Sequence, residues 1–326
     1  MRAIVCRTWC APEDLRIEDV PVPAAGEGSV RIKVRAAGVN FADTLIIAGK
    51  YQIKPVPPFT PGFEVAGEVT DCGAEVSRFR PGDRVMAIVE YGGFAEQVIA
   101  PENQVFALSP GIDDVVAASF PVAYGTSHFG LREKAALQAG ETLLVLGAAG
   151  GVGLTAVETG KLMGATVIAA ASGETKCEIA KQAGADHTID ARAPEFRDRV
   201  KDLTDGRGVD VVYDPVGGPA FEQALRCTTP GGRILIVGFA SGTVQQIPAN
   251  ILLVKNISAI GFYWGAHRIL SPQGMARSFN ELIRWLGEGK LRPHVSGTYP
   301  LEEAVRALSD LKARTTTGKV VLTLAD

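Results

Sequence analysis

The sequence predicts an α/β protein with two domains, one built from short antiparallel strands and one from a parallel sheet covered by helices. Its 326 residues are about twice the length of a typical domain. Hydrophobic residues make up 46% of the chain and charged residues 21%, a composition typical of a globular protein with a substantial core. The hydrophobic pattern changes along the chain, from alternation with a period of two to continuous apolar runs between helical segments.

The N-terminal part, up to about residue 122, has the pattern of short strands. In residues 30–34 apolar and basic side chains alternate, which predicts a strand with one buried and one solvated face. Gly and Pro interrupt such runs, as at Pro81-Gly82, where they favour a turn. We therefore expect a small antiparallel barrel or sheet over residues 1–122.

The middle part, from about residue 123 to residue 264, has a different pattern. Short apolar runs alternate here with segments of helical periodicity. Runs that are apolar on both faces and separated by helices are typical of a parallel sheet with crossover helices. The runs lie at residues 142–146, 166–170, 209–213, 233–237 and 257–262.

The C-terminal part, residues 265–326, predicts two amphipathic helices and a final strand over residues 319–324. The first helix is expected to end at Gly287 and the second to begin near Pro300. Because two helices and one strand cannot bury a core of their own, we expect this part to return to the N-terminal domain. The expected buried positions are Phe279, Leu282, Ile283 and Leu286, then Leu301, Ala304, Val305 and Leu308.

Composition also excludes several classes of partner. Lys and Arg total 33 against 36 Asp and Glu, a net charge of −3 with no block of like charge, so no nucleic-acid or membrane-surface partner is expected. No apolar run approaches the roughly 20 residues that span a bilayer, and Arg7 comes too early for a signal-peptide core. The five cysteines are odd in number and contain no Cys-x-x-Cys, which favours reduced thiols and a cytoplasmic location.

A glycine-rich loop follows the first apolar run of the middle part. Residues 142–146 lead into residues 147–153, where Gly150, Gly151 and Val152 open a predicted helix. Small residues let the backbone approach a pyrophosphate, and a helix N-terminus offers free N–H groups with a positive dipole end. The first glycine of the usual Gly-x-Gly-x-x-Gly pattern is replaced by Ala148, so the strand-loop-helix context carries the prediction. The alternative is a tight turn that packs closely without a ligand.

The end of the second apolar run predicts which dinucleotide binds. NAD sites usually place an acid there to accept a hydrogen bond from the ribose 2′-hydroxyl, but residues 169–173 contain none. Ser172 can donate to a 2′-phosphate and Lys176 can neutralise it, and charge-assisted contacts of this kind contribute about 1.5–3 kcal/mol each. We therefore expect NADPH, although the nearby Glu174 weakens the preference. The alternative is that Ser172 caps a helix and Lys176 is merely solvated.

Several motifs occur in a fixed order along the chain, at residues 36–43, 49–51, 61–67, 81–85, 147–153 and 210–218. With these motifs the chain resembles, over essentially its whole length, the zinc-independent quinone oxidoreductases (zeta-crystallin-like) of the medium-chain dehydrogenase/reductase superfamily. The resemblance implies a GroES-like catalytic domain from residues 1–122 and 265–326 and an inserted Rossmann NADPH-binding domain over residues 123–264. It further implies a homodimer or homotetramer, with the strand at residues 257–262 as the dimer edge.

The same resemblance bears on metal binding. Zinc-dependent relatives carry Cys at the position of Asn40, a His-Glu pair at Phe63-Glu64 and a lobe of four cysteines, none of which this chain has. The four histidines are dispersed, so we expect no metal. Without a Lewis acid to polarise a plain ketone, a substrate that conjugation has already made electrophilic accepts hydride more readily.

Residue roles follow from the resemblance one position at a time. Tyr51 and Asn40 are expected near the nicotinamide, with Tyr51 donating a hydrogen bond or proton; alternatively Tyr51 packs in the cleft and solvent supplies the proton. Asp43 is expected to be a structural partner rather than a base. Leu45 and Ala191 replace tyrosines found in relatives, and Arg192 or Arg314 is expected to compensate for the tyrosine missing at residue 191. Further cofactor contacts are implied for Thr126, Gly238, Phe239, Phe262, Tyr263, Trp264, Arg314 and Lys319.

Three functions are consistent with these observations. The first is an NADPH-dependent quinone oxidoreductase that acts on a small molecule without a metal. The second is a reductase of an activated alkene, namely an enone, a 2-alkenal or an enoyl thioester. The third is an NADPH-binding structural or regulatory protein with little turnover. Two of the implied contacts have structural alternatives as well, since Thr126 could cap a helix and the aromatic residues 262–264 could belong to a dimer edge.

Overall fold

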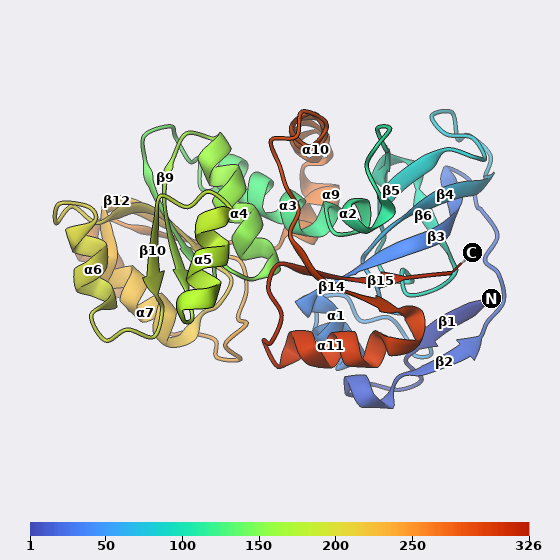
Figure 1. Cartoon of the computed structure of the whole chain (residues 1–326), viewed down its shortest axis with the longest axis horizontal. Helices are drawn as coiled ribbons and strands as arrows, with labels where there is room; N and C mark the ends of the chain where they lie inside the picture. Colours follow the sequence, from blue (N-terminus) through green and yellow to red (C-terminus); the bar gives the residue numbers. More distant parts are fainter. Residues whose placement is uncertain (326) are drawn as a thin grey trace. The chain divides into compact units, whose positions relative to one another are not determined.

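The computed structural model describes residues 1–325, and its elements fall into two units (Figure 1). Unit 1 combines residues 1–122 with the C-terminal residues from 293 onward, and unit 2 comprises residues 123–292. Within residues 1–325, no helix combines the length and apolar character needed to cross a membrane.

Unit 1 is built on a mainly antiparallel seven-stranded sheet with β3 at its centre. The order is β14-β15-β3-β4-β5-β7, and β6 also pairs with β3. Side chains of β3 alternate between buried and half-buried from Ser29 to Ala36, as the period of two predicts. The strands are β3 (Ser29–Val39), β4 (Glu64–Cys72), β5 (Arg84–Ile88), β6 (Gln97–Pro101), β7 (Val105–Ala107), β14 (Val295–Pro300) and β15 (Lys319–Thr323), and β1 (Arg2–Val5) pairs separately with β2 (Arg16–Asp19).

The C-terminal segment completes the core of unit 1. β15 pairs antiparallel with β3, with Val320 opposite Val39, and Leu308 and Leu322 are fully buried in the same cluster as Val34. The predicted return of the chain to the N-terminal domain is therefore observed for this strand and for α11. The helices of unit 1 are η1 (Pro12–Asp14), α1 (Phe41–Ile47), η2 (Glu102–Gln104), α2 (Asp114–Ala118), η5 (Leu301–Glu303) and α11 (Ala304–Lys312).

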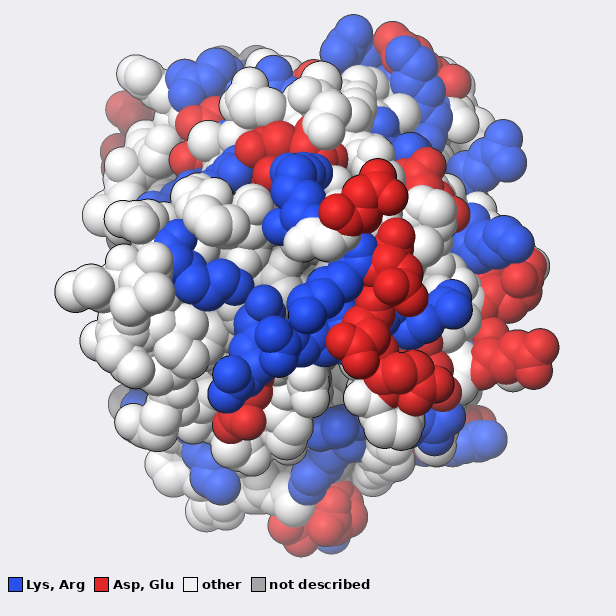
Figure 2. Space-filling view, turned by 90° about the vertical axis from the view of Figure 1, so that its left-hand side faces the viewer, with Lys and Arg blue, Asp and Glu red and all other residues white. Residues whose placement is uncertain are grey.

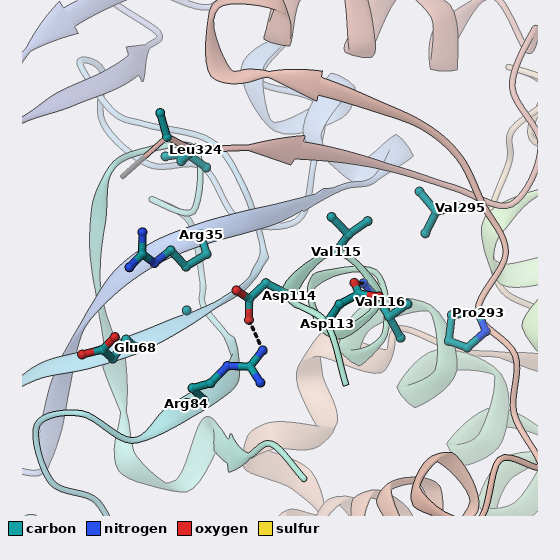
Figure 3. A pocket seen from close by; sticks show the side chains of 12 residues that line it. Arg35, Glu68, Arg84, Asp113, Asp114, Val115, Val116, Pro293, Val295 and Leu324 are labelled. Carbon is teal, nitrogen blue, oxygen red and sulfur yellow. Dashed lines mark hydrogen bonds and ion pairs between the residues drawn. The ribbon is translucent and has the colours of Figure 1, made fainter. Parts of the chain in front are cut away.

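Unit 1 also contains an open pocket beside α2 whose lining combines charged side chains with apolar ones such as Val116 and Leu324 (Figure 3). Arg84 of β5 donates to the Asp114 carboxylate at 2.5 Å and to the Ile112 carbonyl at 2.9 Å. Arg35 and Glu68 line another part of its wall. None of the site residues predicted from the sequence lines this pocket, so it is not the candidate site.

Unit 2 is a six-stranded parallel sheet in the order β10-β9-β8-β11-β12-β13. This is the doubly wound order, in which the chain reverses direction across the sheet between β8 and β11. Its strands are β8 (Thr142–Leu146), β9 (Thr166–Ala171), β10 (His187–Asp190), β11 (Val209–Asp214), β12 (Thr228–Ile236) and β13 (Ser258–Gly261). Ligands of such sheets bind at the carboxyl ends of the strands beside the reversal, so the candidate site belongs at the ends of β8 and β11.

Helices α4 and α5 pack against β8, β9 and β10, and α7 packs against β11 and β12. The fully buried β8 is covered on both faces, which explains its continuous apolar run. The helices of unit 2 are α3 (Pro121–Phe129, which begins at the last residues of unit 1), η3 (Gly130–Lys134), α4 (Gly151–Leu162), α5 (Glu174–Gln182), α6 (Phe196–Asp202), α7 (Gly218–Cys227), α8 (Ala249–Lys255), η4 (Trp264–Ala266), α9 (His267–Leu270) and α10 (Pro272–Gly287).

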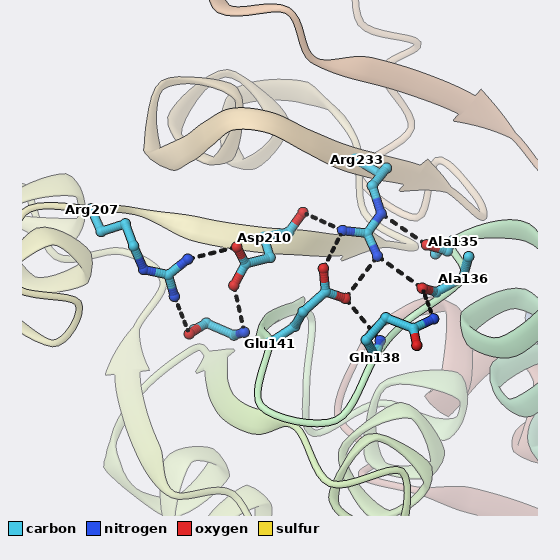
Figure 4. Close-up of polar contacts among 8 residues, drawn as sticks. Ala135, Ala136, Gln138, Glu141, Arg207, Asp210 and Arg233 are labelled. Carbon is cyan, nitrogen blue, oxygen red and sulfur yellow. Dashed lines mark hydrogen bonds and ion pairs between the residues drawn. The ribbon is translucent and has the colours of Figure 1, made fainter.

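Ion pairs join the amino ends of three strands of this sheet (Figure 4). Arg233 of β12 binds Glu141, just before β8, through two contacts of 2.7 and 2.8 Å. Asp210 of β11 accepts from the Thr142 backbone N–H at 2.7 Å and pairs with Arg207 at 2.6 Å. These contacts occupy the amino edge of the sheet, opposite the edge at which the glycine loop lies.

The boundary of unit 2 differs from the predicted one, because the unit extends to Arg292 instead of ending at Trp264. Helix α10 buries its apolar face within unit 2, where Phe279 contacts Trp264 with ring centroids 6.3 Å apart. His128 of α3 also bonds to Ser278 of α10 at 2.8 Å. The amphipathic pattern predicted the helix correctly, but it does not say which core the apolar face covers.

Basic and acidic side chains lie side by side on the face seen from the left of Figure 1 (Figure 2). A band of Lys and Arg adjoins a group of Asp and Glu there, so neither sign of charge covers this face.

Candidate active site

A buried polar cluster lies in unit 1 where three neighbouring strands meet. Asn40 directly follows β3 and begins α1, Glu64 is the first residue of β4, and Lys319 is the first residue of β15. β15 and β4 flank β3 in the sheet, which brings together three residues far apart in sequence. Their exposed fractions are 8%, 0% and 5%, so the cluster is an internal one.

Every donor of the Lys319 ammonium group has an acceptor in this cluster. Its Nζ donates to the Val39 carbonyl at 2.9 Å, to Asn40 Oδ1 at 2.7 Å and to Glu64 Oε1 at 2.8 Å. Asn40 Nδ2 donates to Glu64 Oε1 at 2.8 Å, and the Val122 backbone N–H donates to Glu64 Oε2 at 2.8 Å. The buried carboxylate is therefore matched by one cation and two neutral donors, as a buried charge requires.

This arrangement changes the roles expected for two residues. Lys319 was expected to contact the cofactor, but its ammonium group is directed into the protein and its hydrogen bonds are all used there. Both ends of the Asn40 amide are also engaged within the cluster. Direct contact of either polar group with a ligand therefore requires these bonds to break, and the geometry favours a positioning role for both.

Asp43 links this cluster to the turn before β4. Its Oδ2 accepts from the Asn40 backbone N–H at 2.7 Å and its Oδ1 accepts from the Gly62 backbone N–H at 3.0 Å. Burial raises the pKa of Asp43 to about 7, although both N–H groups and Lys319 favour its charged form. The carboxyl group holds the start of α1 against residue 62, which agrees with the structural role expected for it.

Tyr51, the candidate catalytic residue, packs on the core of unit 1 and against Phe63. Its ring centroid is 5.4 Å from that of Phe63, and the two ring planes are tilted by 59°. Phe63 is the residue before Glu64, so the tyrosine packs next to the segment that carries the buried carboxylate. Asn40 and Glu64 are thus in direct contact, and Tyr51 reaches this part of unit 1 through Phe63.

In unit 2 the glycine loop has the form that a phosphate-binding turn needs. Gly147 has a φ of 59°, and a Cβ atom on it would lie 2.8 Å from Val216. A Cβ atom on Gly153 would lie 2.2 Å from the Gly147 carbonyl oxygen, so α4 packs too closely against the loop for any other residue. At Gly150, by contrast, the nearest atom would be 3.4 Å away, which leaves the backbone accessible at the start of α4. The first N–H groups of this helix have no intrahelical acceptor and can bind a pyrophosphate.

The ends of β9 and β10 form the corner where the 2′-position is expected. Lys176 lies in the first turn of α5, which begins directly after this corner. Helix α5 has Gly173 as its N-cap, with no side-chain cap, so the alternative role of Ser172 as the capping residue is wrong. Gly173 has a φ of 83°, a left-handed value that glycine adopts without the strain that a side chain would cause.

Sequence reasoning missed an acid at this corner. Asp190 ends β10 directly opposite Ala171 of β9, so the carboxylate comes from the neighbouring strand. Arg192 donates its backbone N–H to Asp190 Oδ1 at 2.9 Å, and the guanidinium group lies 3.4 Å from the same oxygen. Hydrogen bonds from Arg192 and from the Gly173 backbone lower the pKa of Asp190, which keeps the carboxyl group ionised. The strand that carries this acid, residues 187–190, reads His-Thr-Ile-Asp and has no apolar run that would have singled it out.

The other predicted contacts fall into two groups. Phe239 follows β12 and is 41% exposed, whereas Phe262 and Trp264 are almost wholly buried and pack on Phe129 and Phe279 within unit 2. The remaining residues are placed as follows: Thr126 is buried on α3, Gly238 precedes Phe239, Tyr263 lies between the two buried aromatics, and Arg314 follows α11 in unit 1 with a φ of 58°.

Ser127 of α3 links this helix to α4 and β11 through its hydroxyl group. The Ser127 hydroxyl lies 2.7 Å from the Thr155 hydroxyl on α4 and 3.1 Å from the Tyr213 hydroxyl on β11, and it donates to the Val152 carbonyl at 2.9 Å. These bonds fix α3 to the first turn of α4 and to the strand beyond the sheet reversal. Ser127 was not singled out from the sequence because a lone serine in an apolar helix carries no pattern.

No group of three or more His, Cys, Asp or Glu side chains among residues 1–325 is arranged to hold a metal ion.

Comparisons with known proteins agree with this two-unit architecture. Residues 26–110 match the alcohol dehydrogenase GroES-like domain, and residues 151–286 match the family described as zinc-binding dehydrogenase. The quinone oxidoreductase-like protein 2 homolog of Nematostella vectensis is 42% identical over 325 residues, which covers 98% of this chain and 88% of that protein. The quinone oxidoreductase of Pseudomonas aeruginosa is 37% identical over 312 residues, which covers 95% of this chain and 96% of that protein.

A solved structure is similar over the same length. The crystal structure of Escherichia coli quinone oxidoreductase complexed with NADPH superposes with a TM-score of 0.91 at 29% identity, covering 99% of this chain and all of that one. A GroES-like domain combined with a Rossmann-type parallel sheet is the architecture of the medium-chain dehydrogenases/reductases, and the predicted fold class is confirmed. Within that superfamily the chain belongs to the quinone oxidoreductase family.

Proposed function

We propose that this protein is an NADPH-dependent oxidoreductase that reduces a quinone without a metal ion. The observation that carries the proposal is the Asn40–Glu64–Lys319 cluster, in which Asn40 and Glu64 occupy positions where zinc-dependent relatives carry the Cys and the Glu named above, and Lys319 binds both. An amide, one carboxylate and an ammonium group are not a zinc ligand set. The carboxylate and the amide oxygen are already bound by the Lys319 ammonium group, so the chemistry of these donors does not fit a metal.

The residues of unit 2 fit a dinucleotide. Gly150, Gly151 and Val152 would bind the pyrophosphate through the free N–H groups of α4. Thr126, Gly238, Phe239 and Tyr263 remain the proposed contacts on the nicotinamide side, with the buried Phe262 and Trp264 supporting them. When bound, NADPH supplies a hydride to the acceptor.

Selectivity for NADPH depends on the corner between β9 and β10. A 2′-phosphate there would meet Ser172, Lys176 and Arg192. Asp190 would repel a phosphate, but Arg192 already binds this carboxylate and offsets its charge. We expect Lys176→Ala to weaken NADPH binding by about tenfold and to leave NADH binding unchanged. An unchanged ratio of the two affinities would contradict the assignment.

The acceptor is proposed to be conjugated because this site offers hydrogen-bond donors in place of a Lewis acid. Negative charge develops on the acceptor oxygen as hydride arrives, and a donor aimed at that oxygen stabilises it. Tyr51 is the proposed donor, and its ring is held in place by contact with the buried Phe63. The Asn40–Glu64 hydrogen bond of the buried cluster joins the start of α1, which leads to Tyr51, to the residue after Phe63.

The test is NADPH oxidation across a panel of quinones, enones, alkenals and an enoyl thioester. The proposal expects the largest kcat/KM for a quinone and a decrease of about 10- to 100-fold in Tyr51→Phe. A saturated carbonyl product with little quinone turnover would instead show that the protein is an alkene reductase. Cofactor binding without turnover on any acceptor would favour a binding protein.

We also propose that the protein is a homodimer located in the cytoplasm. Strand β13 is an edge of the parallel sheet, so its outer backbone groups are available for pairing with a second copy. Large apolar side chains are exposed in the same unit, on α8 and α9, and a second copy would bury them; they are Leu253, Val254, Ile269 and Leu270. Light scattering that gave the mass of a monomer would contradict the dimer, and twice the dimer mass would indicate a tetramer. All five cysteines are free thiols, which agrees with a reducing compartment.

A further inference from the structure

Two of the free cysteines are neighbours in space. Cys6, just after β1, and Cys10, four residues further on, place their Sγ atoms 3.6 Å apart. The Cys6 thiol also lies 3.0 Å from the Thr8 carbonyl oxygen, and within residues 1–325 the thiols of Cys72 and Cys177 contact backbone oxygens but no other thiol. The Cys6–Cys10 pair is thus a cluster of nucleophilic groups to which the proposed function gives no role.

The backbone holds both members of this pair in place. Cys6 exchanges two backbone hydrogen bonds with Phe59, of 2.8 and 3.1 Å, and the Cys10 backbone N–H donates to the Ile47 carbonyl at 2.8 Å. The intervening segment consists of only three residues, 7–9, so neither sulfur can move far from the other. Formation of a disulfide requires the sulfur atoms to approach by about 1.5 Å from their present separation.

We propose that Cys6 and Cys10 form a reversible two-electron redox pair, which hydrogen peroxide oxidises to a disulfide. Cys10 is partly exposed and Cys6 is fully buried, so Cys10 is the thiol that meets the oxidant. Disulfides of cytoplasmic proteins are usually transient and redox-sensing, and a pair of this kind fits that pattern.

The chemistry balances in two steps. The Cys10 thiolate attacks one peroxide oxygen, so an S–O bond forms, the O–O bond breaks and the departing hydroxide is protonated to water. The Cys6 sulfur then attacks the Cys10 sulfenic acid, so the S–S bond forms, the S–O bond breaks and a second water leaves. Two thiols have lost two electrons and two protons, and a small dithiol such as dithiothreitol reverses the change.

The surroundings of the pair predict a slow, alkali-favoured reaction. Burial raises the pKa of Cys6 to about 12 and also raises that of Cys10, so little thiolate is present at neutral pH. At Cys10 the acidic side chains of Asp14 and Glu13 raise the pKa further, whereas the Cys6 thiol and Arg16 lower it. Cys10 therefore retains the more accessible thiolate of the two.

The pair also connects to the segment that carries Tyr51. The Ile47 carbonyl, which ends α1, accepts from the Cys10 backbone, and a Cβ atom on Gly49 would lie 2.9 Å from the ring of Trp9. Oxidation that shifts residues 7–10 would therefore displace residues 47–51. We expect the disulfide to raise KM for the acceptor more than it changes cofactor affinity, an effect that rests on the proposed function.

The test uses the full chain and trypsin. Cleavage after Arg2, Arg7 and Arg16 puts Cys6 on the peptide of residues 3–7 and Cys10 on the peptide of residues 8–16. After treatment with hydrogen peroxide and alkylation of the remaining thiols in denaturant, mass spectrometry is expected to find these two peptides joined. The joined peptide should be lost on reduction with dithiothreitol, and the number of alkylated thiols should fall from five to three.

Two variants serve as controls. The joined peptide should persist in Cys72→Ser and should be absent in Cys10→Ser, in which Cys6 remains alkylatable. Alkylation of both cysteines after peroxide treatment, a sulfinic acid on Cys10 without the joined peptide, or joining of Cys10 to another cysteine would overturn the proposal. Because this readout does not use catalysis, it stands apart from any failure of the proposed quinone reduction.

Discussion

Replacing Lys319 with methionine tests whether the buried cluster holds unit 1 together. The substitution keeps the length of the side chain but removes the ammonium group, which leaves the Val39 carbonyl, the Asn40 amide oxygen and the Glu64 carboxylate without their shared donor. Removing one partner of a buried ion pair costs about 3–5 kcal/mol, because the other charge stays buried and uncompensated. With a urea dependence of about 2 kcal/mol per M, the unfolding midpoint should fall by about 2 M.

The assay is equilibrium urea unfolding at neutral pH, followed by the fluorescence of Trp9, the tryptophan of unit 1, and by circular dichroism. The matched control is Lys312→Met on the exposed side of α11, which should cost less than about 0.5 kcal/mol. The double variant Glu64→Gln/Lys319→Met should be more stable than Lys319→Met alone, because a neutral amide at residue 64 can pair with Asn40 and with the Val122 N–H. A cost below about 1 kcal/mol for Lys319→Met, or a double variant less stable than the single one, would refute the reasoning.

Further predictions concern the glycine loop and the buried carboxyl group. Gly153→Ala should cost more than about 2 kcal/mol and abolish dinucleotide binding, because its Cβ atom would lie 2.2 Å from the Gly147 carbonyl oxygen. In the control Gly287→Ala the new Cβ atom would meet nothing within 4 Å, so this variant should be neutral in thermal unfolding and in cofactor titration. If Gly153→Ala and Gly287→Ala had equal effects, the close contact of Gly153 would not be the cause. Asp43 has a pKa of about 7 in the folded protein and an ordinary value of 3.8, so between these pH values the folded state holds a proton that the unfolded state has lost. The free energy of unfolding should therefore fall as pH rises from about 4 to 7, by an amount on the order of 2 kcal/mol between pH 5 and 7. Asp43→Asn, which leaves a backbone N–H such as that of Gly62 unpaired, should be less stable than the wild type at pH 5 and should lose this slope; urea midpoints at the two pH values measure both effects.

Local patterns were sufficient to predict the parts of the fold that depend on local periodicity. The alternation along β3 and the apolar run of β8 correspond to a half-buried strand and a fully buried strand, respectively. The glycine loop was predictable because its residues are contiguous and their spacing reflects one close contact, between Gly153 and Gly147. The helical periodicity of α10 was equally clear. That α10 packs in unit 2, however, depends on contacts with α3 that no local pattern encodes.

The residues that were misjudged depend on partners far apart in sequence. Lys319 opens a short strand near the C-terminus, where a lysine is normally solvated, and its burial depends on Asn40 and Glu64 more than 250 residues away. Asp190 ends β10, whereas the dinucleotide prediction used the end of β9, so its place beside Ala171 follows only from the strand register. Polar clusters assembled across a sheet are therefore the part of the site that the sequence alone does not reveal.

The most direct test of the central claim, reduction of a conjugated acceptor without a metal, is turnover and metal content measured on the same sample. The account predicts that quinone reduction by NADPH continues unchanged after exhaustive treatment with a chelator, and that elemental analysis finds only substoichiometric zinc. One firmly bound zinc per chain, with activity that is lost on chelation and restored by zinc, would contradict it.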